Sequence, residues 1–471
     1  MHRVLLTAVV LTWLLPSAQG SDSPVRFQVQ PMAAPKPALR YVLLPEVREL
    51  HPGNPAQWYV RCFAEQRNFF FSKEGVTERE RYRALPLAQL RSQHLDDYGG
   101  NALRQADWAA RLDALDWQVG QRLRTDGLDV QLPEVQPLRI LGMALQARFR
   151  ARIAAGHFDS AIDNAKTMFG LARHLGQYPA LAGNQIGLSI ANQAVDSLDE
   201  MVQQPGCPNL YWALTDLPRH VVELRQGVQG DRTQADVELA RIHDDAPMSA
   251  EELEQVVSRL SGRMGFAREQ AGLPPRSVRA GLEARVHNAD QVRAACRRLA
   301  SAECTDDASA PQAAYQFLEL SMKYNKFPPM QVILLDEKRA YQARRDQTMK
   351  LLGLEAWQID NMLAREKRSA DKGLFDGFGP DLLQMKWAQA RLEQRLALLR
   401  HVEALRLYAA GHHGKLPRQL ADMELPLPSD PFTGKPFRYH LDGATAYLDG
   451  GSPRGDGNQP TYNIHYEITI R

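Results

Sequence analysis

The sequence predicts a mainly α-helical protein that ends in a small antiparallel β tail. Over residues 57–410 the apolar side chains recur at intervals of three and four, which is the spacing of one helix face. After Pro431 they alternate with polar residues, which is the spacing of a half-buried strand. Of the 471 residues, 44% are hydrophobic, and this share is typical of a globular chain rather than a disordered one.

The first 20 residues have the pattern of a secretory signal peptide. Arg3 supplies a positive start, residues 4–15 are apolar, and small residues precede a predicted cleavage after Gly20. No later stretch reaches about 18 consecutive apolar residues, the length that a membrane-spanning helix requires. We therefore expect an exported protein in the periplasm, in the cell envelope or outside the cell, with no transmembrane anchor in its mature form.

The remainder divides into three parts. Residues 21–56 contain seven prolines and are expected to form an extended lead-in along the surface. Residues 57–380 form a helical body, and residues 381–471 combine a long helix, at 381–410, with the β tail. Within the body, the apolar spacing predicts helices at 103–119, 138–156, 158–172, 180–203, 208–228, 231–243, 249–269, 287–301, 308–324, 328–352 and 354–366.

Two of these helices meet at the sequence A-A-G-H-F-x-x-A, residues 154–161. Small residues let antiparallel helices approach closely, and this hairpin resembles one tetratricopeptide (TPR) unit. Three clean copies at a 34-residue period are not present in the sequence. We therefore expect a degenerate α-solenoid or a TPR-like helical-hairpin body.

The four cysteines are compatible with one or two disulfides after export. Cys296 and Cys304 are the closest pair, and a bridge between them requires the helix to end near Ala300. In one unbroken helix their Cα atoms would be about 12 Å apart, which is too far for a disulfide.

The tail begins where Pro417 ends the long helix, because proline lacks the N–H that a helix needs. The string D-P-F-T-G-K-P-F-R-Y, residues 430–439, places a turn at Thr433-Gly434 between aromatic residues. Residues 437–441 and 446–448 are predicted strands joined by a hairpin turn at Asp442-Gly443, and residues 462–470 form a last strand.

This order of helix, D-P-F-x-G-x-P-F-x-Y string and hairpin resembles the globular end of major type II secretion pseudopilins. The resemblance covers about the last seventy residues and implies a helix packed on a short sheet. The prepilin-peptidase site and the apolar assembly helix of that family are not present, so the resemblance extends to the tail fold and not to filament formation. The whole chain resembles a group of uncharacterised exported bacterial proteins that combine a helical-repeat body with such a tail.

The string supplies a structural motif with no catalytic role, made of Asp430, Pro431, Phe432, Gly434, Pro436, Phe437 and Tyr439. We expect the three aromatic rings to anchor the sheet on the long helix, Asp430 to brace the turn, and Gly434 to adopt a conformation that other residues avoid.

The loop at 449–458 resembles the stretch that binds calcium in major pseudopilins. A calcium ion there would use oxygens of Asp449, Asp456 and Asn458. Arg454 is an unfavourable neighbour for a cation, and Gln459-Pro460-Thr461 replace the acidic residues expected downstream. These two departures favour a turn without a metal.

The sequence contains no H-E-x-x-H zinc motif, no phosphate-binding loop and no G-x-S-x-G nucleophile elbow. The net charge of +2 argues against a dedicated nucleic-acid binder. We expect a non-enzymatic scaffold that binds a protein partner. The alternatives are a hydrolase whose site is assembled from distant residues, and a cell-envelope component associated with a secretion filament.

Overall fold

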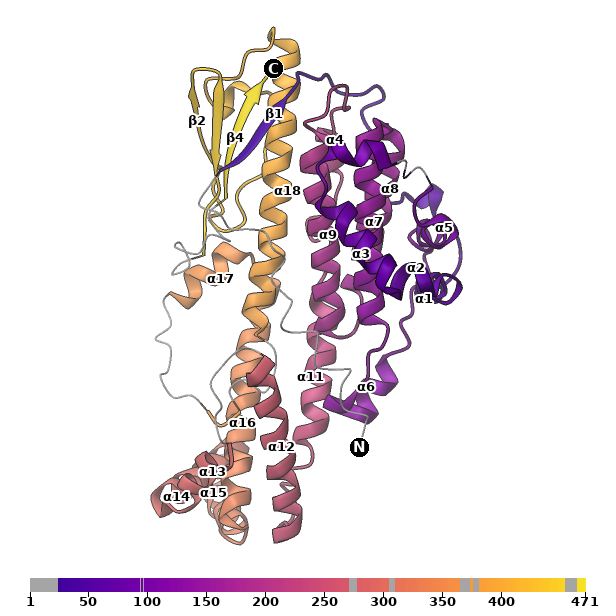
Figure 1. The fold of residues 1–471 in the computed structure, drawn as a ribbon. Helices are drawn as coiled ribbons and strands as arrows, with labels where there is room; N and C mark the ends of the chain where they lie inside the picture. The colour runs from indigo at the N-terminus through magenta and orange to yellow at the C-terminus, as the bar shows by residue number, and fades with distance from the viewer. Residues whose placement is uncertain are drawn as a thin grey trace.

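The structure is a computed structural model that describes residues 24–93, 95, 97–270, 278–304, 310–364, 373–375, 381–453 and 464–471. It is mainly helical and carries one small sheet, as the sequence predicts, although the sheet has four strands rather than the three expected. Figure 1 shows an elongated molecule in which long helices run side by side, with the sheet at one end and a cluster of helices at the other. Among the described helices, none combines the length and the apolar character that crossing a membrane requires.

Short helices cover one side of the molecule near the sheet end (Figure 1). The short helices are α1 (Pro55–Glu65), α2 (Arg67–Phe71), α3 (Lys73–Ala84), α4 (Leu87–Leu90), α5 (Gly100–Ala109) and α6 (Gly120–Asp126). Helices α2, α3 and α4 pack on α7 (Val135–Ala155), and α5 packs on α8 (Phe158–Gly176); α7 and α8 form the hairpin that the sequence predicts. Helix α1 packs on α5, whereas α6 lies further from the sheet (Figure 1) and packs on α11 (Arg225–Leu239). Gly156 ends α7 with φ of +77°, a conformation that glycine adopts readily.

The third long helix of this group is α9 (Leu181–Met201), which packs on both α7 and α8. Gly187 permits the close approach to α8, because a Cβ atom there would lie 3.0 Å from the Ala172 carbonyl oxygen. The three helices form a compact bundle, and their interiors belong to a single hydrophobic core that we call the upper core.

Three helix predictions in the body differ from the structure. The helix expected at 103–119 ends at Ala109, because the chain turns so that Trp117 donates to the carbonyl of His174 (3.1 Å) inside the upper core. The helices expected at 208–228 and 231–243 are one short turn, α10 (Tyr211–Thr215), and a separate helix, α11 (Arg225–Leu239). Pro218 lies between them and lacks the N–H that a continuous helix would need.

A second set of helices forms the opposite end of the molecule: α12 (Ala250–Gln270), α13 (Val278–Val286), α14 (Ala289–Glu303), α15 (Ala310–Asn325) and α16 (Pro329–Met349). Their apolar side chains form a separate core, the lower core, around residues such as Leu282, Leu299 and Leu334. The chain returns through α17 (Ala356–Leu363) to α18 (Leu382–Gly411), the predicted long helix, which runs alongside α9 to the sheet (Figure 1).

The sheet has the strand order β1-β4-β3-β2. Strands β2 (Arg438–Asp442), β3 (Thr445–Asp449) and β4 (His465–Ile470) are antiparallel, as predicted. The hairpin loop is Gly443-Ala444, one residue later than the predicted Asp442-Gly443, since Asp442 pairs with Thr445. The expectation that all strands follow Pro431 is wrong. Strand β1 (Val25–Val29) belongs to the N-terminal lead-in and pairs parallel with β4, because it buries Phe27 and Val29 beside Tyr466 and Ile468.

Candidate functional site

Helix α15 exposes an unusual amount of apolar surface. Tyr315, Leu318 and Met322 are 74%, 60% and 60% exposed, although tyrosine, leucine and methionine usually pack against a neighbour. They are spaced three and four residues apart and therefore lie on one face of the helix. We call this face the α15 stripe. Figure 1 places α15 at the end of the molecule away from the sheet, where a partner could reach it.

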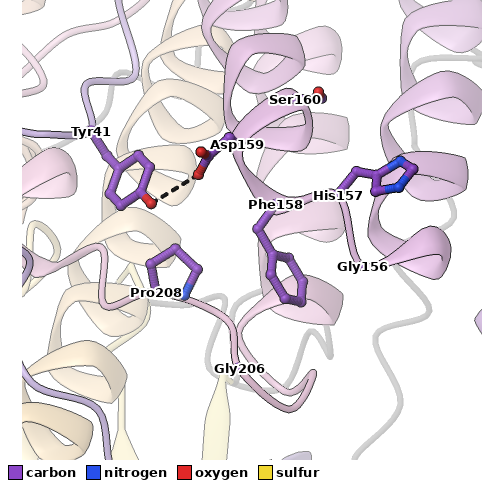
Figure 2. Close-up of a pocket in the computed structure, with 8 residues that line it drawn as sticks. All are labelled: Tyr41, Gly156, His157, Phe158, Asp159, Ser160, Gly206 and Pro208. Atoms are coloured by element: carbon purple, nitrogen blue, oxygen red, sulfur yellow. Dashed lines mark hydrogen bonds between the residues drawn. The ribbon is translucent and has the colours of Figure 1, made fainter.

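A shallow hollow of about 450 Å³ lies at the α7–α8 turn (Figure 2). The Tyr41 hydroxyl donates to Asp159 Oδ1 (2.9 Å), and the Arg40 guanidinium lies 3.5 Å from the same carboxylate. Burial and the bond to Asp159 raise the pKa of Tyr41 above its ordinary value. The hollow is lined by Tyr41, Gly156, His157, Phe158, Asp159, Ser160, Gly206 and Pro208.

The groups best suited to acid–base chemistry lie elsewhere, between α18 and the segment before α11. His220 Nδ1 is 2.5 Å from Glu393 Oε1. Lys386, on the same helix as Glu393, is buried and donates to Gln389 Oε1 (3.0 Å). Burial lowers the pKa of this lysine. None of these side chains lines the hollow in Figure 2, so the concavity and the acid–base groups do not coincide.

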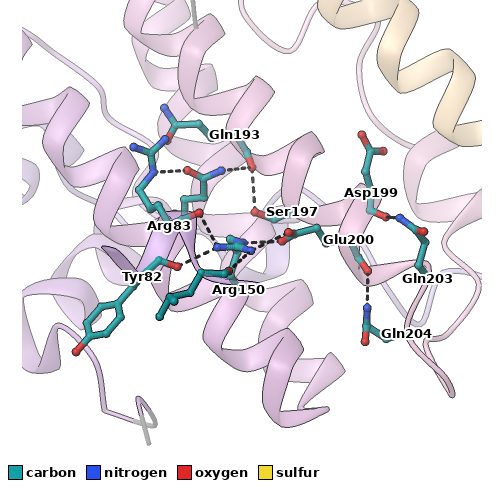
Figure 3. A network of polar contacts seen from close by, with 11 residues as sticks. Tyr82, Arg83, Arg150, Gln193, Ser197, Asp199, Glu200, Gln203 and Gln204 are labelled. Atoms are coloured by element: carbon teal, nitrogen blue, oxygen red, sulfur yellow. Dashed lines mark hydrogen bonds and ion pairs between the residues drawn. The ribbon is translucent and has the colours of Figure 1, made fainter. Parts of the chain in front are cut away.

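Other buried charges connect elements that are distant in sequence. Arg150 of α7 forms an ion pair with Glu200 of α9, at 2.6 Å. The same guanidinium donates to the carbonyls of Tyr82, Arg83 and Leu85, the last residues of α3 and the chain after it. Figure 3 shows that it is surrounded by protein groups, and it therefore fastens α3 to the bundle rather than facing a ligand.

The most deeply buried ion pair joins Glu403 and Arg406 of α18, and both side chains are fully buried. Arg406 also donates to the carbonyls of Gln30 (3.0 Å) and Cys207 (2.8 Å), and Glu403 accepts from the N–H of Leu210 (3.0 Å). The pair thus fixes the lead-in and the segment after α9 to α18. Neither residue was expected to have a role from the sequence. The only local signal is a pair of opposite charges three residues apart in an otherwise apolar part of the helix.

The structure brings the predicted tail residues together in the expected way. Asp430 is buried and accepts from the N–H groups of Phe432 (3.0 Å) and Gly451 (2.6 Å) and from the Gln394 amide (3.0 Å). Its backbone carbonyl accepts from the N–H of Gly434 (2.8 Å), and Gly434 has φ of +66°. The brace that the sequence predicts at this turn is confirmed.

The aromatic residues of the motif contact α18 or its continuation. Phe432 packs on Trp387, Phe437 meets the ring of His401 with centroids 4.9 Å apart, and the Tyr439 hydroxyl donates to the carbonyl of Pro417 (2.6 Å). The prolines close the arrangement: the Pro431 carbonyl accepts from the N–H of Trp357, and Pro436 leads into β2.

The remaining predicted site residues do not form a site in the described chain. Asp449 lies 2.7 Å from His465 Nδ1, whereas Asp456 and Asn458 lie outside the described residues. The structure shows no bridge between Cys296 and Cys304, because α14 continues unbroken to Glu303 and keeps the two thiols apart. Among the described residues, no cluster of three or more histidine, cysteine or acidic side chains could hold a metal ion.

Comparisons of the chain with protein-family models, with curated proteins and with solved structures found no match.

Proposed function

We propose that the protein is an exported, non-enzymatic scaffold that binds a protein partner through the α15 stripe. The observation that carries this proposal is the exposure of Tyr315, Leu318 and Met322 on one helix face. Contiguous apolar surface on a folded protein costs free energy in water and typically marks a place where another protein binds.

The spacing of the stripe suggests the shape of the partner. Apolar residues at positions i, i+3 and i+7 form the seam along which two helices pack. The partner surface that fits this seam best is an amphipathic helix with the same spacing. Glu319 and Lys323 lie along one side of the stripe and carry opposite charges, so this rim of the contact accepts a helix that carries both signs.

Three further features support this proposal. The signal-like residues 1–20 support export, and N-terminal sequencing of the native protein should return Ser21. The packing of α18 on the β2–β3–β4 sheet and the braced turn at Asp430 support the pseudopilin-like tail. The α7–α8 hairpin supports a TPR-like unit in the body.

The proposal is tested by binding, with matched variants. Partners are captured from a cell-envelope extract by cross-linking, identified, purified and titrated against the full chain. Leu318→Asp combined with Met322→Asp should weaken binding at least about tenfold, because each charge would be buried in an apolar contact. Val47→Asp is the control, since Val47 is 86% exposed and belongs to the segment whose Glu49 binds Lys166 of α8. Equal affinity of all three proteins would overturn the proposal.

A further inference from the structure

The outermost strand of the sheet has an open edge. In the order β1-β4-β3-β2, β2 has β3 on one side only, and Figure 1 shows β2 at the outer margin of the sheet, away from α9. Within the part of the chain that the structure describes, no backbone group hydrogen-bonds the other side of β2. An open edge of this kind is a template for another strand.

The hairpin fixes which backbone groups face outward. The two-residue loop is closed by the pair Asp442 and Thr445, and in a two-residue hairpin this closing pair is hydrogen-bonded. Hydrogen-bonded and non-bonded pairs alternate along an antiparallel ladder, so His440 and Arg438 also direct their backbone groups to β3. The N–H and C=O groups of Tyr439 and Leu441 therefore point away from the sheet.

The sequence of β2, R-Y-H-L-D, is complementary to itself in the antiparallel direction. A two-fold axis at His440 places Arg438 of one copy opposite Asp442 of the other, twice. The same axis places Tyr439 opposite Leu441, and these are the residues whose backbone groups face outward. Four backbone hydrogen bonds and two ion pairs would form together in this register. Shifting the axis by one residue would oppose Arg438 to His440 and lose both ion pairs.

The side chains on the exposed face are available for this pairing. Arg438, His440 and Asp442 are exposed, while Tyr439 and Leu441 are half-buried toward α18. The neighbouring Asp449 faces Arg438 in the hairpin, but its carboxylate contacts His465 at 2.7 Å. Beyond the strand, the register would bring Pro436 beside the small residue Ala444.

We propose that β2 pairs antiparallel with β2 of a second copy of this chain, with the two-fold axis at His440, and joins the two sheets into one. This inference is independent of the α15 stripe, which lies at the opposite end of the molecule. Five residues a side make a small contact in the size range of transient complexes. Self-association should therefore depend strongly on protein concentration.

A charge swap tests the register in solution. Sedimentation of the wild-type chain should show the average mass rising from monomer toward dimer with concentration. Arg438→Asp should weaken dimerisation about tenfold or more, because two Asp–Asp pairs replace two ion pairs, and Asp442→Arg should do the same. The double variant restores opposite charges and should return to within about threefold of wild type. A wild-type chain that stays monomeric, or a double variant as weak as the single ones, would overturn the proposal.

Cysteine cross-linking locates the axis, with Cys304→Ser as background in every variant. In the proposed register the two copies of His440 form a non-hydrogen-bonded pair with Cα atoms about 4.5 Å apart, within disulfide range. His440→Cys should therefore yield a disulfide-linked dimer under mild oxidation. Arg438→Cys is the matched control, because its two copies would lie about 13 Å apart along the strands. Equal cross-linking of both variants, or pairing of β2 with a strand of a different protein, would overturn the proposal.

Discussion

At the scale of single residues, the Glu403–Arg406 pair shows how a buried charge can be structural. Removing Arg406 would leave a carboxylate inside the upper core and three carbonyls without their donor. We expect Arg406→Met to lower the free energy of unfolding by about 3–5 kcal/mol. The double variant Glu403→Gln with Arg406→Met removes the uncompensated charge and should regain part of this loss.

Urea unfolding of the three proteins measures the effect. Lys415→Met is the control, because Lys415 is exposed and lies shortly after the end of α18. This substitution should change the free energy of unfolding by no more than about 0.5 kcal/mol. A loss for Arg406→Met no larger than that of the control would show that the buried pair does not hold the lead-in to α18.

Two buried histidines make stability depend on pH. Burial lowers the pKa of His174 to about 3 and that of His401 to about 4. In the unfolded chain both titrate near pH 6.5, so the unfolded state binds two more protons than the folded state as pH falls below that value. Their contribution is complete above about pH 7 and is lost on acidification. At pH 5 each histidine should lower the free energy of unfolding by about 2 kcal/mol relative to neutral pH.

The contribution of each histidine can be separated by substitution. Urea unfolding at pH 7, 6 and 5 should show the free energy of unfolding of the wild type falling steeply with pH. The slope of this free energy against pH measures the number of protons taken up on unfolding, and His401→Gln should reduce that number by about one. His174→Gln should do the same, although it also alters the contact with the Tyr59 hydroxyl (3.0 Å). Slopes that are identical in all three proteins would contradict the assignment of these histidines.

At the scale of elements, strand β1 was not expected from the sequence. Phe27 is buried and its ring centroid lies 4.8 Å from that of Tyr466. Phe27→Ala should lower the free energy of unfolding by about 3–5 kcal/mol. Val25 lies in the same strand but is 44% exposed, so Val25→Ala should cost less than about 1 kcal/mol. Thermal unfolding of both variants distinguishes a structural strand from a loose lead-in, for which the two losses would be equal.

The long helices and the hairpin were predictable because their signals are local. Helix α18 begins at the cap Asp381, whose side chain accepts from two backbone N–H groups, and Gly156 ends α7. Strand β1 was not predictable, because its alternation spans five residues beside several prolines and its partner lies more than 400 residues away. Pro218 is a sequence signal for the break after Thr215. The apolar spacing on both sides of Pro218 nevertheless has the period of a continuous helix, and this led to the wrong prediction.

The candidate functional surfaces also differ in whether a local sequence signal predicts them. The tail motif could be predicted because Asp430 and Gly434 act within one turn. The exposure of the α15 stripe could not, because its apolar spacing is that of any core-facing helix, and only the packing of α14 and α15 decides which face is left outside. The acid–base group of His220, Glu393 and Lys386 joins segments more than 160 residues apart and has no local pattern.

At the scale of the whole molecule, the two cores are expected to unfold separately. The upper core contains the bundle and the sheet, and the lower core is formed mainly by α12–α16. They are connected through a few elements, chiefly α11 and α16. Separate cores with limited contact are typical of regions that open independently, and the smaller one should open first.

The distribution of tryptophan makes this measurable. The lower core contains no tryptophan, because the six described ones belong to the upper core, its surface or α17 and α18: Trp58, Trp108, Trp117, Trp212, Trp357 and Trp387. In urea, circular dichroism should therefore begin to fall before tryptophan fluorescence changes, since the helices of the lower core carry no such probe. Coincident transitions would indicate a single cooperative unit.

Substitution of one fully buried leucine in each core shows which core gives rise to which unfolding transition. Leu334→Ala in the lower core and Leu145→Ala in the upper core should each cost about 2–5 kcal/mol in their own unit. Leu334→Ala should move the early part of the circular dichroism transition and leave the fluorescence midpoint in place. Leu145→Ala should lower the fluorescence midpoint, because that probe reports the upper core. If Leu334→Ala moved both midpoints equally, the two cores would be coupled through α11 and α16, and a partner on α15 would stabilise the whole chain rather than one end of it.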